Sequence, residues 1–371
     1  MIYKDTLDTD LYPVVFADCI PVKGVVRSII YDFSRNRYTY IPNILFEILF
    51  DNTKNIRQLI SVYGNENKKY IIDYFKFLID KNFLFFSQSP ESFPKLNLDF
   101  ETPSEITNVI LDIAVSMPMS QHYKSAIEIL SEKLGSKYFQ LRIYDDIGLE
   151  NLKELLGFFV DTKVVSIEIV LKYSNKFVHN DIEQILEECP RITNLVFHSV
   201  SKDISLKKTG LLQSSYPIHF SSEIINSCEQ CGIISNNHFS VDIQTYTESQ
   251  SLNSCLNKKV SIDIEGNIKN CPSMQKSYGN ITNTNIEDII KLKEFKYLWS
   301  ISKAQIDVCK DCEYRFMCTD CRAYIKNSND LYSQPLKCNY NPYIAKWEAE
   351  EGYISVKQWR TENPDWKNNI S

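Results

Sequence analysis

The feature of this 371-residue sequence that most constrains its fold is a concentration of cysteines toward the C-terminal end. Nine of the eleven cysteines follow Ser222, in a region where the expected strands and helices are short. Two Cys-x-x-Cys pairs, Cys309–Cys312 and Cys318–Cys321, are separated by only five residues. Two residues between paired cysteines allow a tight turn to direct both sulfurs at one metal. The sequence therefore predicts a loop-rich, metal-organised region after Ser222.

Further cysteines lie on either side of these pairs. Residues 258–264 and 268–270 have strand composition and enclose a glycine-containing turn, which predicts a hairpin with Cys255 and Cys271 near its open end. Cys338 follows the pairs after a polar loop. Seven cysteines, from Cys255 to Cys338, are therefore candidates for metal binding.

Seven cysteines do not fill two sites of four ligands each. An eighth ligand must come from elsewhere in the chain, from a substrate or from solvent, and Cys231 of the Cys228–Cys231 motif could supply it. Four thiolates suit either a closed zinc site or an iron-sulfur cluster, and spacing alone does not separate the two. Cys19 and Cys189 are isolated in apolar segments and are predicted to be buried free thiols.

Composition argues against several classes of function. The formal net charge of -6 arises from 47 acidic and 41 basic residues mixed along the chain, so neither a nucleic-acid footprint nor a polybasic membrane patch is expected. Residues 1–15 lack a secretory signal, and no apolar run approaches the roughly 20 residues that span a bilayer. We expect a cytoplasmic protein, in which cysteines bind metal rather than form disulfides.

Residues 1–100 are expected to form a winged-helix-like unit. Apolar spacing indicates the order strand, strand, helix, helix, helix, strand, at residues 25–33, 37–41, 43–50, 55–63, 67–80 and 83–86. A structural cap and a peptide-docking module are both compatible with this pattern.

Residues 101–221 alternate between strands and helices. The expected strands are 106–115, 139–144, 164–171, 192–198 and 216–220, with helices at 123–134, 149–160 and 180–189. This alternation requires a mostly parallel sheet with right-handed crossovers. A complete (β/α) barrel takes ~250 residues. We therefore expect an α/β fold with an incomplete barrel, followed by a cysteine-rich lobe at 222–345 and a tail at 346–371 that contains a helix and a frayed end.

The cysteine pattern resembles that of the SPASM domain, which follows radical SAM barrels in peptide-modifying enzymes. The resemblance rests on Cys255-x10-Gly266-x4-Cys271, on Cys309-x2-Cys312-x5-Cys318 with a partner close behind, and on Cys338. The usual pattern has three residues inside the third pair, whereas Cys318 and Cys321 enclose two.

Longer strings extend the resemblance to the SPASM-containing peptide maturases of grasp-with-spasm systems. They are CLNKKVSIDIEGNIKNCPSM, SYGNI, VCKDCEYRFMCTDCRAYI and LKCNYNPY, together with CIPVKG and RSIIYDFSRNRYTYIPN near the N-terminus. Members of that family accompany an ATP-grasp peptide ligase and a small precursor peptide in bacteria, so these two are the expected partners. The resemblance implies up to two auxiliary 4Fe-4S clusters, one held by Cys309, Cys312, Cys318 and Cys338, the other by Cys255, Cys271, Cys321 and the candidate Cys231.

A catalytic radical SAM cluster needs a C-x3-C-x2-C triplet, which leaves one iron free for S-adenosylmethionine. The corresponding place, Ser116 to Tyr123, reads SMPMSQHY and holds no cysteine. The glycine-rich stretch expected after the second strand is also missing, since Asp145 to Leu149 reads DDIGL. We therefore expect a barrel remnant that does not use S-adenosylmethionine, we assign no catalytic or organic-cofactor-binding residue, and we leave open whether the protein is an enzyme.

Three functions compete on this basis. The first is a bacterial ribosomal-peptide (RiPP) maturation protein that binds a precursor peptide by strand addition and acts with an ATP-grasp ligase. The second is a redox-active peptide maturase that uses auxiliary 4Fe-4S clusters. The third is a zinc-ribbon interaction protein.

Overall fold

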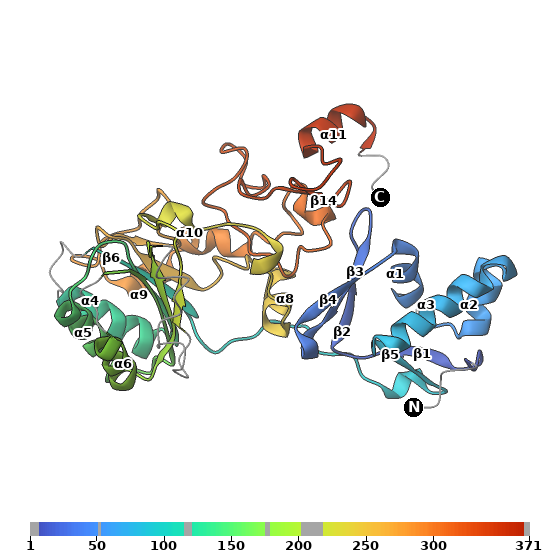
Figure 1. Ribbon diagram of the computed structural model, residues 1–371, viewed down its shortest axis with the longest axis horizontal. Helices are drawn as coiled ribbons and strands as arrows, with labels where there is room; N and C mark the ends of the chain where they lie inside the picture. The colour runs from blue at the N-terminus through green and yellow to red at the C-terminus, as the bar shows by residue number, and fades with distance from the viewer. Residues whose placement is uncertain (1–6, 51–52, 115–120, 175–178, 202–217, 367–371) are drawn as a thin grey trace.

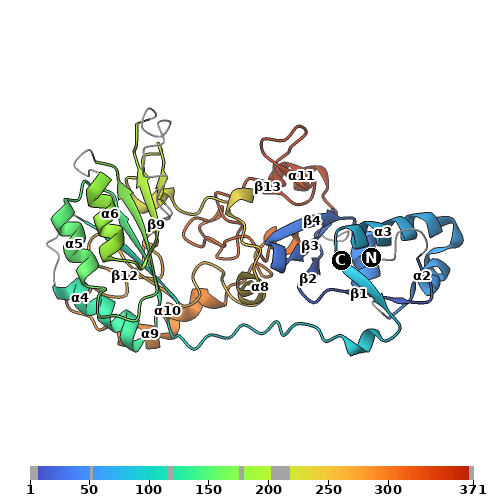
Figure 2. The same ribbon diagram turned by 60° about the horizontal axis from the view of Figure 1, so that its bottom comes forward.

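The computed structural model describes residues 7–50, 53–114, 121–174, 179–201 and 218–366. The molecule is elongated, with an N-terminal unit at one end, an α/β unit at the other, and the cysteine-rich segments between them (Figure 1). Residues 88–107, which contain a short 3₁₀ turn but no strand or α-helix, connect the two units along one side (Figure 2).

The N-terminal unit is a three-stranded antiparallel sheet packed with three helices and a two-stranded ribbon. The sheet has the order β2-β3-β4, formed by Cys19–Val22, Ser28–Asp32 and Arg37–Ile41. The helices are α1 (Asn43–Phe50), α2 (Ile56–Tyr63) and α3 (Lys68–Asp80). The ribbon pairs β1 (Tyr12–Val15) with β5 (Leu84–Ser87). The three helices, β3, β4 and β5 fall where the sequence predicted them.

Strands β1 and β2 were not predicted, and each contains a proline. Pro13 lies in β1 and Pro21 in β2. A proline cannot donate to a ladder, so it argues against a strand unless that strand lies at an edge. Both strands are edges among the described residues, since β1 pairs there only with β5 and β2 only with β3. The edge position of each strand therefore allows a proline that would be unfavourable in a central strand.

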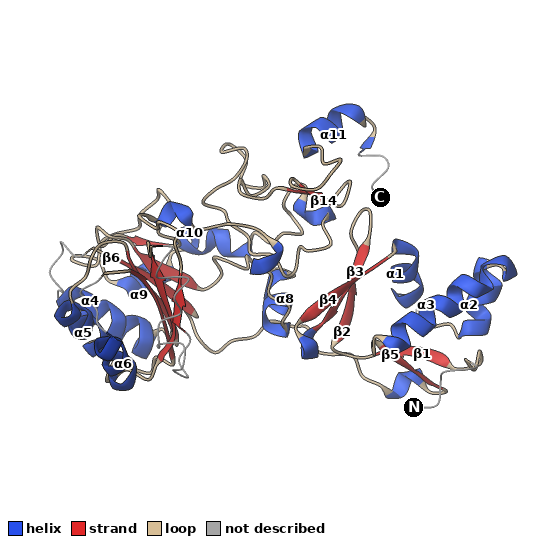
Figure 3. Cartoon of the chain, viewed as in Figure 1, coloured by secondary structure: helices blue, strands red, loops and turns tan. Residues whose placement is uncertain are grey.

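The α/β unit is built on a seven-stranded sheet of order β10-β9-β8-β7-β6-β11-β12. Five parallel strands match the expected positions: β6 (Asn108–Ile113), β7 (Tyr138–Ile143), β8 (Ser166–Lys172), β9 (Ile192–His198) and β10 (Ile218–Phe220). Helices α4 (Gln121–Glu128), α5 (Leu149–Gly157) and α6 (His179–Glu188) cover one face of this sheet (Figures 1 and 3).

The hairpin of the cysteine-rich region extends the same sheet. Strand β11 (Lys259–Ile262) pairs in parallel with β6, and β12 (Ile268–Lys269) returns antiparallel to β11. The sheet is therefore open, with β10 and β12 at its edges, rather than closed into a barrel. Val260, Ile262 and Ile268 belong to the α/β hydrophobic core, so the hairpin is anchored in that core rather than held by metal alone.

The face of the sheet opposite α4, α5 and α6 is polar. Phe139, Leu141 and Ile143 of β7 pack into the core, so the alternate residues Gln140 and Arg142 point the other way. The Arg142 guanidinium donates two hydrogen bonds, of 2.6 and 2.9 Å, to the buried carboxylate of Asp112. Glu168 accepts hydrogen bonds from the amides of Gln140 and Asn194 on the neighbouring strands.

The remaining C-terminal elements are short. They are α8 (Ile243–Ser249), α9 (Ile286–Lys291), α10 (Lys293–Lys296), the pair β13 (Tyr340–Asn341) and β14 (Lys346–Trp347), and α11 (Val356–Glu362). The helix expected in the tail is thus present as α11. Within the described ranges, no helix has the length and apolar character needed to cross a membrane.

Candidate metal centre

Four cysteines, three from one short segment and one from a later segment, line one small cavity. We call Cys309, Cys312, Cys318 and Cys338 the first quartet. Three of them are less than a tenth exposed, and Cys312 is partly exposed. The same cavity is lined by Lys303, Tyr314 and Tyr340. The structure therefore brings together the four residues that the resemblance to SPASM domains grouped as one ligand set.

Tight turns place these sulfurs. A 3₁₀ turn at Cys309–Asp311 lets the Cys312 amide donate to the Cys309 carbonyl at 3.0 Å. The next turn closes with the Cys318 amide donating to the Tyr314 carbonyl at 3.1 Å. Cys338 comes from a separate segment, and its amide donates to the Pro335 carbonyl at 3.2 Å. Two-residue spacing is thus sufficient for the local pairs, whereas Cys338 is recruited by tertiary folding.

The second quartet consists of Cys231, Cys255, Cys271 and Cys321. Cys231 and Cys255 both lie within electrostatic range of Cys271 and of Cys321. A β-carbon built on Gly232 would lie 3.0 Å from the Cys321 sulfur, so the chain at Cys231 passes directly against Cys321. Cys271 and Cys321 are buried, whereas Cys231 is exposed.

The neighbouring residue Cys228 takes a different position. Its thiol lies within electrostatic range of Tyr144 and Tyr324. Its backbone carbonyl accepts a hydrogen bond from the Ser273 hydroxyl at 2.9 Å. Cys231 lies within electrostatic range of Lys259, Cys271 and Cys321. Its role as the eighth ligand stays a prediction.

Burial raises the pKa of the Cys309, Cys312 and Cys318 thiols in the first quartet and of the Cys271 and Cys321 thiols in the second. Loss of hydration is the main cause of the raised pKa at Cys309, Cys312 and Cys318, and neighbouring thiols add to it at Cys309 and Cys312. In the second quartet burial, followed by Cys255, raises the pKa of Cys271 to about 12. Such thiols stay protonated unless a metal ion or cluster compensates their charge.

Each quartet also has one lysine beside a sulfur. The Lys303 ammonium lies 2.6 Å from the Cys318 sulfur and is 3 % exposed. The Lys259 ammonium lies 3.5 Å from the Cys255 sulfur. Neither lysine was singled out from the sequence, since nothing in the residues around them separates them from the other lysines.

A buried ion pair lies between the two quartets. Asp320 sits inside the Cys318–Cys321 motif, whose first cysteine belongs to the first quartet and whose second belongs to the second. Its carboxylate accepts two hydrogen bonds from the Arg322 guanidinium, at 2.7 and 3.0 Å, and one from the Asn253 amide at 2.7 Å. Because Asp320 and Arg322 are both fully buried, their side chains hold the motif in one conformation.

The cysteine sulfurs do not form tight groups of three. Among the described residues, no three cysteine sulfurs lie within 4.8 Å of one another. In a tetrahedral zinc site with Zn–S bonds of ~2.3 Å, the four sulfurs lie about 3.8 Å apart. In this arrangement neither quartet presents three sulfurs at the spacing of a tetrahedral zinc site.

The turn between β2 and β3 packs directly on the first-quartet loop. The Val25 amide donates to the Asp311 carbonyl at 3.0 Å, and a β-carbon on Gly24 would lie 2.9 Å from that of Glu313. The Arg27 guanidinium donates to the buried Glu313 carboxylate at 2.8 Å. The N-terminal unit is thus attached to the segment that carries Cys309, Cys312 and Cys318.

The C-terminal helix also packs on this loop, in an apolar cluster that includes Val25 of the β2–β3 turn. Val308, directly before Cys309, has a φ of 68°, which is costly for a β-branched residue. Val308 is buried against Tyr343 and Val356, and Trp359 of α11 stacks on Tyr343 with ring centroids 4.3 Å apart. Arg360 donates two hydrogen bonds of 2.8 Å to Asp307. These contacts hold the backbone that orients Cys309.

Replacing Arg360 with methionine should loosen this segment, because Asp307 loses both of its hydrogen bonds to α11. We expect amide hydrogen exchange at residues 308–312 to become about fivefold faster, which corresponds to about 1 kcal/mol for a partly exposed pair. Lys357→Met, which removes an exposed charge from the same helix, should leave the exchange rate unchanged. Equal exchange in wild type and Arg360→Met would show that α11 does not hold the loop.

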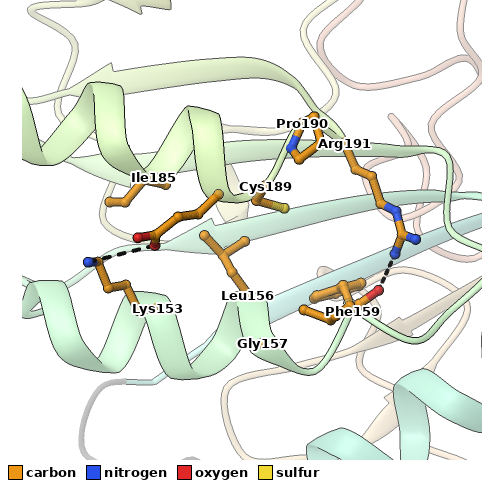
Figure 4. A pocket seen from close by; sticks show the side chains of 10 residues that line it. Lys153, Leu156, Gly157, Phe159, Ile185, Cys189, Pro190 and Arg191 are labelled. Atoms are coloured by element: carbon orange, nitrogen blue, oxygen red, sulfur yellow. Dashed lines mark hydrogen bonds and ion pairs between the residues drawn. The ribbon is translucent and has the colours of Figure 1, made fainter.

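The other two cysteines lie apart from the quartets. Cys189 borders a cavity of about 340 Å³ between α5 and α6, on the outer helical layer (Figure 4). Cys19 is buried near Asp18 and Asp32, and the Asp32 carboxylate accepts from Arg35 and Arg37 at 3.0 Å each. The prediction of a buried free thiol is confirmed for Cys19, whereas Cys189 is partly exposed.

The place that lacks the C-x3-C-x2-C triplet is only partly described. Residues 115–120 lie outside the described ranges, and Gln121 to Tyr123 begin α4. The segment 145–149, where the sequence lacks a glycine-rich stretch, leads from β7 into α5.

Comparison with known proteins identifies the cysteine-rich region. No curated protein matches the chain. The crystal structure of SuiB from Streptococcus suis aligns over 84 % of this chain and 96 % of that one, with 10 % identity and a TM-score of 0.28, which is too low to support an argument. Residues 254–313 match the SPASM family, described as an iron-sulfur cluster-binding domain. With Cys255, Cys271, Cys309 and Cys312 inside the matched segment, this chain carries a SPASM iron-sulfur-binding domain.

Proposed function

We propose that this protein takes part in the maturation of a ribosomally made peptide and holds two 4Fe-4S clusters, one on each quartet. The observation that carries the proposal is the assembly of eight cysteines into two groups of four around a SPASM segment. No three cysteine sulfurs among the described residues lie within 4.8 Å of one another, which favours a cluster over a single zinc ion. The cysteine pattern resembles that of SPASM domains in peptide-modifying enzymes, and this resemblance supports a peptide as the substrate.

The N-terminal unit supplies a place for an extended peptide. The edge strands of its sheet are β2 and β4. Within the described ranges, the outer side of each strand makes no further backbone hydrogen bond, except that the Cys19 amide donates to the Phe16 carbonyl. Strand β2 contains Pro21, which lacks an N–H, whereas β4 contains no proline. Strand addition to β4 is therefore the docking mode we propose for the precursor peptide. In this view the unit is winged-helix-like and acts as a peptide-docking module rather than a cap.

The α/β unit is, in this proposal, a remnant of a radical SAM barrel that does not bind S-adenosylmethionine. Its open sheet and the absence of the cysteine triplet from the sequence support this view. The polar face of the sheet and the cysteine-rich lobe would then serve an ATP-grasp ligase that forms the bonds in the peptide. All partners would meet in the cytoplasm.

Metal analysis tests the first part of the proposal. Protein purified without oxygen should contain iron and acid-labile sulfide in equal amounts, enough for two clusters, with absorbance near 400 nm. Zinc in place of iron would contradict the proposal and favour a zinc-ribbon interaction protein.

Peptide binding tests the second part. A precursor peptide that binds should slow amide hydrogen exchange in β4, because its backbone pairs with the free edge. Unchanged exchange in β4 and no binding would contradict the docking mode.

Cleavage of S-adenosylmethionine separates the proposal from the redox-active maturase. Anaerobic protein incubated with reductant and S-adenosylmethionine should yield no 5'-deoxyadenosine, and its formation would favour the redox-active maturase.

A further inference from the structure

Each quartet has one lysine whose ammonium group lies against a cysteine sulfur, and this pairing carries an inference that rests on the proposed clusters. Lys303 lies beside Cys318 of the first quartet, and Lys259 lies beside Cys255 of the second. The two lysines come from unrelated segments, the loop after Ile301 and strand β11. The same contact between a lysine ammonium and a cysteine sulfur thus occurs twice, on segments with different backbone structure.

The Lys303 ammonium is buried and lies against the first quartet, with Asp320 also within electrostatic range. In the part of the chain that the structure describes, its one hydrogen-bond acceptor is the Cys318 sulfur. The nearest carboxylate, that of Asp320, is already neutralised by Arg322 and accepts from Asn253. A lysine with 3 % exposure loses most of its hydration, so nearby negative charge, from the ligand thiolates and in part from Asp320, compensates its charge.

The Lys259 side chain holds an equivalent position, but the residue as a whole is partly exposed, whereas Lys303 is buried. It lies within electrostatic range of Cys231, Cys255 and Cys271, three of the four members of the second quartet. Its side chain projects from β11 on the polar face of the sheet, since Val260 and Ile262 point into the core. Lys259 is partly exposed, so solvent weakens its field relative to that of Lys303.

We propose that Lys303 and Lys259 raise the reduction potentials of the two clusters by stabilising their reduced states. One-electron reduction takes a cluster from the 2+ to the 1+ core, with no bond made or broken, and adds one negative charge shared with the thiolates. A low-potential one-electron reductant supplies the electron. A fixed positive charge within hydrogen-bond distance of a ligand sulfur favours the more negative state, and low local polarity strengthens the effect.

The test is a potentiometric titration of the whole protein, with a europium(II) chelate as reductant and electron paramagnetic resonance as the readout. Lys303→Met should shift the midpoint potential of the first-quartet cluster to a more negative value. Lys303→Arg, which keeps the charge, should stay close to wild type. Lys310→Met removes an exposed charge from the same loop and should shift the potential less.

The second cluster is tested in the same way. Lys259→Met should lower the potential of the second-quartet signal and leave the first-quartet signal unchanged. The two signals are assigned with Cys255→Ser and Cys338→Ser, each of which disrupts one quartet. The shift should be smaller than that of Lys303→Met, because Lys259 is more exposed and farther from its sulfur.

Iron and sulfide are measured on every sample, so that loss of a cluster is distinguished from a change of potential. Wild-type protein without iron would contradict the proposed function itself. Full iron content with an unchanged midpoint potential in Lys303→Met, or an equal shift in Lys310→Met, would overturn the inference. If Lys303→Met does not retain iron, Lys303→Gln, which keeps an N–H donor without the charge, provides the same comparison.

Discussion

Replacing Cys309 with serine should reduce the iron content of the protein by about half, because the first quartet loses one of its four thiolates while the second stays intact. Cys309 lines the first-quartet cavity, and none of the four second-quartet cysteines lines that cavity. Iron and acid-labile sulfide should fall in parallel.

The matched control is Cys189→Ser, which removes a thiol that borders a cavity between α5 and α6. Its iron content should equal that of wild type. A reciprocal experiment with Cys255→Ser should remove the other half of the iron. Retention of all iron in both variants would show that the quartets are not the cluster ligands.

The second large effect concerns the attachment of the N-terminal unit to the first-quartet loop. Glu313 is 1 % exposed and accepts hydrogen bonds from Arg27 at 2.8 Å and from the Tyr340 hydroxyl at 2.6 Å. Arg27 also donates to Tyr314 and Tyr340 and stacks on the Tyr40 ring. Removing the Glu313 charge leaves Arg27 without its carboxylate at a site that is largely closed to water.

Glu313→Gln should therefore destabilise this interface by about 3 kcal/mol. This value is the lower end of the range for a broken buried ion pair, and we choose it because Arg27 is partly exposed. Amide hydrogen exchange in β3 should accelerate by roughly a hundredfold where exchange follows local opening. Glu47→Gln removes an exposed ion pair with Lys23 and should change the exchange little. Comparable exchange in both variants would show that Glu313 does not hold the unit in place.

These contacts link the metal-binding loop to a distant part of the chain. Tyr314 lines the first-quartet cavity and shares a hydrogen bond of 2.6 Å with the Tyr40 hydroxyl on β4. Tyr314 and Tyr340 also pack with the aromatic side chains of β3 and β4 in one hydrophobic cluster. The strand proposed to dock the peptide is thus attached to the segment proposed to bind the first cluster.

Local sequence was sufficient for most of the regular elements. Apolar periodicity located α1 to α6 and the strands β3 to β10 because these segments pack one face or stripe into a core. It missed β1 and β2, whose prolines are tolerated only because the strands lie at edges. It also did not show that β11 pairs with β6, since strand neighbours far apart in sequence leave no local signal.

For the metal centre, the sequence by itself determined the cysteines and their paired spacing, because two-residue turns act locally. The match of residues 254–313 to the SPASM family agrees with that pattern. The assignment of each cysteine to a cluster remains a prediction for the iron analysis to decide. Only the tertiary structure brought Cys231 to Cys321 and Cys338 to the Cys309 loop, and placed Lys303 and Lys259 against the sulfurs. Their proximity depends on how separate segments pack, and no spacing within one segment encodes it.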